Sequence, residues 1–148
     1  MTKVLFICHG NICRSVMAEY ILKDMVSKAG RAGEFVIDSA ATSREELGND
    51  IYPPAKRKLN EKGVPFGRHC ARQVTRQDYD DFDHLILMDD ANSRNIRRII
   101  PDDPEGKISL LMSWAGKDDS VADPWYTGDF EKSYTDILEG CEAILKKV

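Results

Sequence analysis

Residues 8–15, which read Cys-His-Gly-Asn-Ile-Cys-Arg-Ser, place a thiol, a glycine and an arginine in one short turn. Cys8 ends the apolar run 4–8 and an amphipathic stretch starts at Ser15, so the turn is expected to join a buried strand to a helix. Its N–H groups, the helix N-terminus and Arg14 can bind a tetrahedral oxyanion without a metal ion. The same groups favour the thiolate of Cys8. The turn is therefore suited to attack by a thiolate on a bound oxyanion.

A purely structural interpretation of these residues stays open. Cys8 could be the buried end of a strand, and Arg14 a surface residue at the start of a helix. The spacing of the two is weak evidence by itself, because such pairs arise by chance. The complete order of strand, glycine loop, Arg-Ser and helix favours the chemical interpretation.

The composition limits the classes of protein to consider. A chain of 148 residues has the length of one domain, residues 1–148, and 42% hydrophobic residues exclude a disordered or collagen-like chain. The net charge of −4 argues against a general nucleic-acid binder. The apolar run 4–8 is too short to span a bilayer and the N-terminus lacks the pattern of a signal peptide, so no membrane partner and a cytoplasmic location are expected.

The cysteine pattern excludes two further kinds of protein. The four cysteines are too few for a disulfide scaffold, and they form no paired Cys-x-x-Cys motifs, so no structural zinc or other metal is expected. Cys70 and Cys141 are expected to be small buried hydrophobic residues.

Short apolar runs alternate with amphipathic stretches along the chain. Strands are expected at residues 4–8, 35–39, 85–88 and 107–110, and helices from 15 to the stop at Gly30 and at 52–61, 90–100 and 130–148, with a short acidic turn or helix around 75–83. This alternation predicts a single doubly wound α/β domain, with a four-stranded parallel sheet, helices on both faces and the 8–15 loop between the first strand and the first helix. Ligands bind such sheets at the carboxyl ends of the strands, where strand order reverses.

The segment 4–15, followed by Met-Ala-Glu at 17–19, resembles the signature of the low-molecular-weight protein tyrosine phosphatases. Other segments in the order of that family extend the resemblance over essentially the whole chain: 38–43, 69–73, 82–83, 88–89 and 123–126. The resemblance implies hydrolysis of aryl phosphate monoesters, with a phosphorylated protein or a small aryl phosphate as substrate and inorganic phosphate as product or inhibitor. It further implies no cofactor and a monomer or weak dimer.

The resemblance assigns catalytic roles to three residues. Cys8 would attack phosphorus and form a cysteinyl-phosphate, Arg14 would bind the phosphoryl oxygens, and Asp123, before Pro124, would protonate the leaving group. Asp-Pro alone is an ordinary turn sequence. Because thiolate and protonated Asp123 must coexist, activity is expected to be highest at mildly acidic pH.

Further residues carry supporting roles in the same resemblance. Phosphate would be bound by His9, Gly10, Asn11, Ile12, Cys13, Arg14 and Ser15. Ser15 would also hydrogen-bond the thiolate, and Asn11, which tolerates a left-handed conformation, would hold the loop through Ser39 and His69. For His69, a merely structural position is an equal alternative.

The resemblance also defines a substrate groove and a redox pair. Ile12, Trp125 and Tyr126 would line the groove, although the aromatic pair could equally fill the core. Cys13 would form a reversible disulfide with Cys8, or else be a loop position that tolerates cysteine.

The chain departs from the family at three positions. His9 stands at a usually apolar or small position and could reach the pocket mouth, and Val16 replaces the usual proline. Glu45 stands where many relatives carry an aromatic residue, and an acidic rim would disfavour substrates with acidic flanks.

Three alternatives share the loop. An arsenate reductase of this kind needs resolving cysteines close together in mid-chain, where Cys70 stands alone. Phosphoarginine phosphatases tend to carry threonine in place of Ile12. A non-catalytic phosphate-binding or thiol-redox module would have no use for the acid Asp123.

Overall fold

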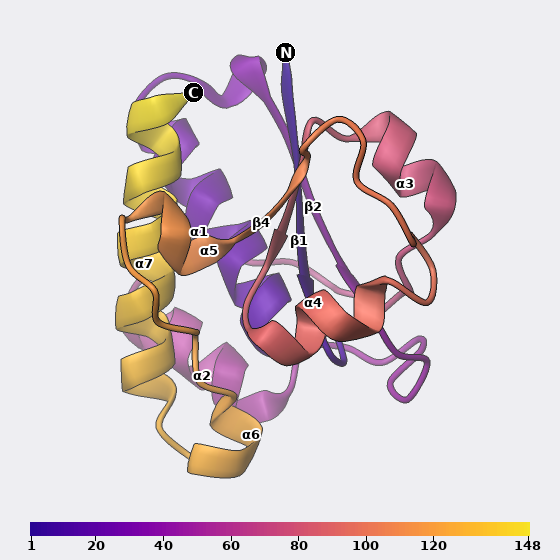
Figure 1. Cartoon of the computed structure of the whole chain (residues 1–148). Helices are drawn as coiled ribbons and strands as arrows, with labels where there is room; N and C mark the ends of the chain where they lie inside the picture. The colour runs from indigo at the N-terminus through magenta and orange to yellow at the C-terminus, as the bar shows by residue number, and fades with distance from the viewer.

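Four parallel strands form the centre of the molecule, in the order β2-β1-β3-β4 (Figure 1). The computed structural model describes all residues from 1 to 148. The strands are β1 (Thr2–Cys8), β2 (Phe35–Ala41), β3 (His84–Leu87) and β4 (Ile108–Leu110). The predicted parallel α/β sheet is confirmed.

Helices cover both faces of the sheet, as predicted (Figure 1). The residues of two separate buried clusters assign the helices to the faces. One face is covered by α1 (Arg14–Lys28), α2 (Pro53–Glu61), α5 (Leu111–Trp114) and α7 (Phe130–Lys147), and the other by α3 (Arg76–Asp81) and α4 (Asp90–Ile96). A 3-10 turn (Ala32–Glu34) precedes β2, and a single helical turn, α6 (Pro124–Thr127), precedes α7.

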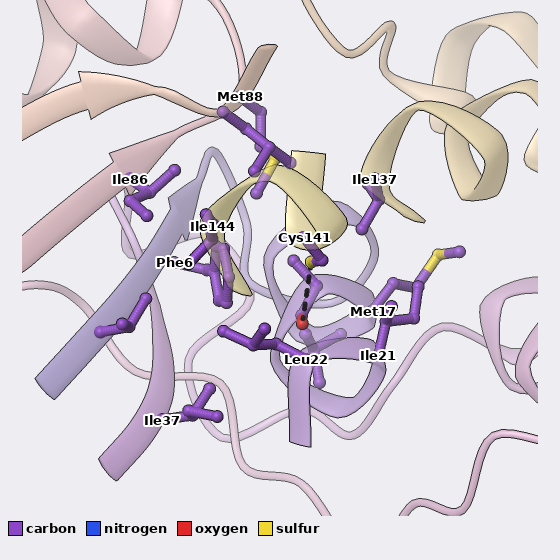
Figure 2. Packing of buried hydrophobic residues seen from close by; sticks show 14 of the residues in the cluster. Phe6, Met17, Ile21, Leu22, Ile37, Ile86, Met88, Ile137, Cys141 and Ile144 are labelled. Carbon is purple, nitrogen blue, oxygen red and sulfur yellow. Dashed lines mark hydrogen bonds between the residues drawn. The ribbon is translucent and has the colours of Figure 1, made fainter. Parts of the chain in front are cut away.

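The central strand β1 is apolar on both faces, because each face meets helices. Val4 and Phe6 belong to the larger buried cluster, and Leu5 and Ile7 to the smaller one. Figure 2 shows the larger cluster, in which strand residues such as Phe6 meet side chains of α1 and α7. This alternation fixes the register of β1, and with it the position of the loop that follows.

Helix α7 approaches α5 closely at Gly140. A Cβ atom at this position would lie 2.5 Å from Cγ of the buried Leu111, closer than side-chain atoms pack. The adjacent Cys141 is buried, and its thiol donates a long hydrogen bond of 3.9 Å to the carbonyl of Ala18 on α1 (Figure 2). The absence of a side chain at Gly140 therefore lets α7 pack closely on α5, while Cys141 faces α1.

The structure corrects three expectations. Helix α4 ends at Ile96 instead of Ile100; residues 97–99 form a turn in which the N–H groups of Ile99 and Ile100 share the Ile96 carbonyl, as is common at helix ends. The single-turn helices α5 and α6 were not expected. Cys141 is buried as expected, but Cys70 is exposed, so the expectation for Cys70 is wrong.

Strand order reverses at β1, because β2 lies on one side of it and β3 on the other. The 8–15 loop follows β1 and therefore lies at the point where sheets of this class bind ligands. None of the helices is long and apolar enough to cross a membrane.

Candidate active site

The carbonyl groups of the 8–15 loop are bound to its surroundings. Those of Cys8 and His9 accept from the N–H groups of Thr42 and Ser43, at 2.9 and 3.1 Å. The Ile12 carbonyl accepts from the N–H of Tyr52 at 2.9 Å. These bonds tie the loop to the segment after β2 and to the start of α2.

The N–H groups of the same loop are free. Those of residues 9–13 donate to no acceptor within the protein. A loop whose carbonyls are occupied and whose consecutive N–H groups are unpaired is a binding site for an anion. Helix α1 begins at Arg14, so its positive end adds to the same site.

Asn11 sets the shape of the loop. It is fully buried and has a φ of 62°, the only positive φ at a residue other than glycine. Its side-chain amide donates to the hydroxyls of Ser15 and Ser39, at 2.8 and 2.9 Å, and its side-chain oxygen accepts from the Arg72 N–H at 3.2 Å. Its carbonyl accepts a 2.6 Å hydrogen bond from Nε2 of His69. The structure thus brings Asn11, Ser39 and His69 together in one network.

The two cysteines of the loop are both buried and line one pocket. The Cys8 thiol donates to Oγ of Ser15 at 3.1 Å, and the same oxygen would donate to the sulfur once Cys8 is ionised. Burial, followed by the proximity of Cys8, raises the pKa of Cys13 well above its usual range. Cys13 therefore stays a neutral thiol beside Cys8.

Arg14 is buried and held by fixed acceptors. One terminal nitrogen donates to Oδ2 of Asp89 at 2.7 Å and to the Val121 carbonyl at 2.8 Å, and the other lies 3.4 Å from Oδ2 of Asp123. Burial alone would lower the pKa of Arg14, but the adjacent Cys8 and the hydrogen bond to Asp89 outweigh it and raise the pKa. The guanidinium is thus permanently charged and fixed in orientation.

Asp123 lies opposite the loop at the start of α6. Its Oδ1 accepts from the Trp125 N–H at 3.0 Å and caps this helical turn, so Oδ2 is the oxygen that faces Arg14. Pro124 takes the first helical position, where a missing N–H costs nothing. Asp-Pro is therefore a turn sequence here, and one that also directs a carboxylate oxygen to the site.

These groups border a cavity of about 130 Å³. We call it the catalytic pocket; it is lined by Cys8, His9, Gly10, Ile12, Cys13, Arg14, Glu45, Glu46, Asp123, Trp125 and Tyr126. Trp125 and Tyr126 are 52% and 83% exposed, so they are wall residues and not core. Ile12 lines the pocket as expected.

The mouth of the pocket carries a polar pair. Nε2 of His9 lies 2.8 Å from Oε2 of Glu45, and both residues line the pocket, as their positions in the sequence suggested. No group of three or more His, Cys, Asp or Glu side chains is arranged to hold a metal ion.

Sequence reasoning missed several residues of the site. Asp89 and Val121 hold Arg14, Glu46 lines the pocket, and the Tyr52 ring lies 4.7 Å from that of Trp125, centroid to centroid. Glu19 accepts a 2.6 Å hydrogen bond from Ser39 and so extends the Asn11 network. The sequence placed Asp89 in a segment shared with the family, 88–89, but gave it no role; in the structure it also caps α4.

The family model "Low molecular weight phosphotyrosine protein phosphatase" matches residues 3–148. The chain belongs to this family. It is 39% identical over 150 residues to the low molecular weight protein-tyrosine-phosphatase YfkJ of Bacillus subtilis, with 100% of this chain and 96% of the relative covered. The human low molecular weight phosphotyrosine protein phosphatase is 38% identical, with 97% and 94% covered.

Solved structures agree with the family assignment. The crystal structure of YfkJ superposes with a TM-score of 0.94, with 99% of this chain and 93% of that chain covered. A Drosophila arginine phosphatase is 33% identical, with a TM-score of 0.88 and coverage of 98% and 96%. The family resemblance drawn from the sequence is confirmed.

Proposed function

We propose that this enzyme hydrolyses phosphotyrosine in proteins, and small aryl phosphates, through a cysteinyl-phosphate intermediate. The observation that carries the proposal is the 8–15 loop, in which the N–H groups of residues 9–13 are unpaired around the Cys8 thiol while the carbonyls of Cys8, His9 and Ile12 accept hydrogen bonds from other segments. Family membership gives the class of reaction, and the residues around the loop match its requirements.

In the first step the Cys8 thiolate attacks phosphorus, and the bond from phosphorus to the phenolic oxygen breaks. The loop N–H groups and Arg14 stabilise the charge on the phosphoryl oxygens, which is the main demand of phosphoryl transfer. Asp123, in its protonated form, gives its proton from Oδ2 to the leaving oxygen. The products of this step are the free phenol and the phosphorylated enzyme.

In the second step water attacks the phosphorus of the cysteinyl-phosphate. Asp123, now a carboxylate, accepts a proton from this water, and the bond between phosphorus and sulfur breaks. The leaving thiolate accepts a hydrogen bond from the Ser15 hydroxyl, whose oxygen is fixed by the amide of Asn11. Inorganic phosphate leaves the site and the enzyme returns to its starting state.

The lining of the pocket supports an aryl substrate over phosphoarginine. Ile12, Trp125 and Tyr126 offer apolar surface on which a phenyl ring can pack. Trp125 is itself packed on Tyr52, which limits its freedom at the pocket wall. The arginine phosphatase among the structural relatives makes phosphoarginine the necessary comparison substrate.

The nucleophile is tested by hydrolysis of p-nitrophenyl phosphate, phosphotyrosine peptide and phosphoarginine, with reduction of arsenate by an added thiol measured in parallel. We expect Cys8→Ser to abolish hydrolysis of both aryl phosphates, and Cys70→Ser, a change at an exposed thiol outside the pocket, to leave it intact. Normal activity in Cys8→Ser would exclude the mechanism. Faster turnover of phosphoarginine than of phosphotyrosine would exclude the proposed substrate.

The acid is tested by varying the leaving group. We expect Asp123→Ala to slow release of a poorly leaving phenol about 10²- to 10⁴-fold, the usual contribution of general acid catalysis, and to affect p-nitrophenol much less. Asp119→Ala, an exposed change in the same loop, is the matched control. An equal loss on both leaving groups would remove the assignment of Asp123.

A further inference from the structure

A second cavity adjoins the catalytic pocket on the side of α4. We call it the rim groove; it has a volume of about 290 Å³ and is lined by His9, Thr42, Ser43, Glu45, Gln73, Asn95, Arg98 and Ile99. His9 and Glu45 line both cavities, so the hydrogen-bonded pair that they form separates one from the other. A peptide whose phosphotyrosine enters the catalytic pocket would place a neighbouring residue over this pair and into the rim groove.

Two groups in the rim groove lack partners. The hydroxyl of Thr42 is buried and has no hydrogen-bond partner, the one such side-chain atom in the protein. Such a group costs free energy unless a ligand or water satisfies it. Arg98 is exposed and forms no ion pair, whereas Arg72, for example, pairs with Asp78. Thr42 thus adds an unsatisfied hydroxyl to the buried wall of the groove, and Arg98 adds an unpaired positive charge.

The remaining polar groups of the groove also suit an anion. Gln73 and Asn95 contribute side-chain amides, of which that of Gln73 already donates to the Thr42 carbonyl at 3.0 Å. Glu45 is the only carboxylate in the lining, and its Oε2 is engaged by His9 at 2.8 Å. Glu45 by itself would repel an acidic group, but the hydrogen bond with His9 occupies its Oε2, and Arg98 supplies the one arginine of the lining.

We infer that the rim groove is a subsite for an acidic side chain of the substrate, next to its phosphotyrosine. This inference rests on the proposed function, since it needs the phosphotyrosine in the catalytic pocket. In the bound state Arg98 pairs with the carboxylate, and the Thr42 hydroxyl donates to it or to a water that it holds. The subsite selects among phosphoproteins and takes no part in the chemistry.

The test compares three phosphotyrosine peptides that differ only in the residues flanking the phosphotyrosine: Glu, Gln or Lys. For the unmodified enzyme we expect kcat/KM for the Glu peptide to exceed that for the Gln peptide about fivefold, which is the effect of one partly exposed ion pair. The difference should lie in KM and not in kcat. Arg98→Gln should reduce this ratio to about one. Arg94→Gln, a change of an exposed arginine in α4 that does not line the groove, should retain it.

A second variant probes the unpaired hydroxyl. Thr42→Val should keep or raise the free energy of unfolding, because it removes a buried hydroxyl that forms no hydrogen bond, and should lower the preference for the Glu peptide. Equal kcat/KM for the Glu and Gln peptides, or a preference for the Lys peptide, would overturn the subsite. So would an equal loss on the Glu and Gln peptides in Arg98→Gln. Hydrolysis of p-nitrophenyl phosphate, which is too short to cross the rim, separates these outcomes from a failure of the proposed reaction.

Discussion

Replacement of Asn11 should show how much the shape of the loop depends on one side chain. Asn11→Ala removes three hydrogen bonds, to Ser15, Ser39 and the Arg72 N–H, each contributing about 1 kcal/mol to stability. It also places an alanine at a φ of 62°, which costs roughly 1 kcal/mol more. The free energy of unfolding should therefore fall by about 4 kcal/mol, as measured by urea denaturation.

A glycine at the same position separates the two contributions. Asn11→Gly loses the same hydrogen bonds but adopts the positive φ freely, so it should be more stable than Asn11→Ala by up to about 1 kcal/mol. At positions with a negative φ the opposite order is usual, and the alanine variant is the more stable of the two. Asn60→Ala, at an exposed position of α2, should change stability little. An alanine variant as stable as the glycine variant would refute the claim that the left-handed backbone stores strain, and a loss below about 1 kcal/mol would refute the network.

Two further predictions concern the core and the redox pair. Gly140→Ala should destabilise the protein by about 1–3 kcal/mol in the same assay, because the new Cβ would meet Leu111 at 2.5 Å, even though alanine favours helices. Gly33→Ala is the control, since a Cβ there would have no atom within 4 Å. Equal effects of the two changes would contradict this packing. After oxidation by peroxide and treatment with a thiol, Cys13→Ser should recover less activity than the unmodified enzyme, because the neutral Cys13 thiol can condense with an oxidised Cys8 and protect it. Equal recovery would leave Cys13 without a redox role.

The parts of the site that are local in the sequence were predictable. Strand, loop and first helix follow one another without interruption, so Cys8 and Arg14 had to meet at one end of the sheet. Strand β1 was predictable because burial on both faces makes it a continuous apolar run. Helix α7 was predictable because burial on one face repeats its apolar residues at helical spacing. The doubly wound order then followed from the handedness of the crossovers.

The parts that depend on distant contacts were not predictable. Asp89 is separated from Arg14 by 75 positions, and the carbonyl of Val121 leaves no mark in the sequence, because every residue has a carbonyl. Helix α6 has one turn, too short for any periodicity, although Asp123 caps it and Gly128 ends it in a left-handed conformation. Cys70 lies in a segment that forms neither helix nor strand, where its neighbour Ala71 is buried and Cys70 is exposed, so no periodic pattern predicts which side chain faces solvent.

The three acceptors around Arg14 have a consequence for the thermodynamics of binding. A guanidinium already immobilised by Asp89 and the Val121 carbonyl has little rotational freedom left to lose when an oxyanion arrives. The second nitrogen faces Asp123 at 3.4 Å, a long contact that a phosphoryl oxygen can replace with a shorter one. One terminal nitrogen of Arg14 thus binds the scaffold, and the other is available to bind the ligand. A lysine at this position has a single compact ammonium group, so it could not bind the scaffold and the ligand through two separate nitrogens.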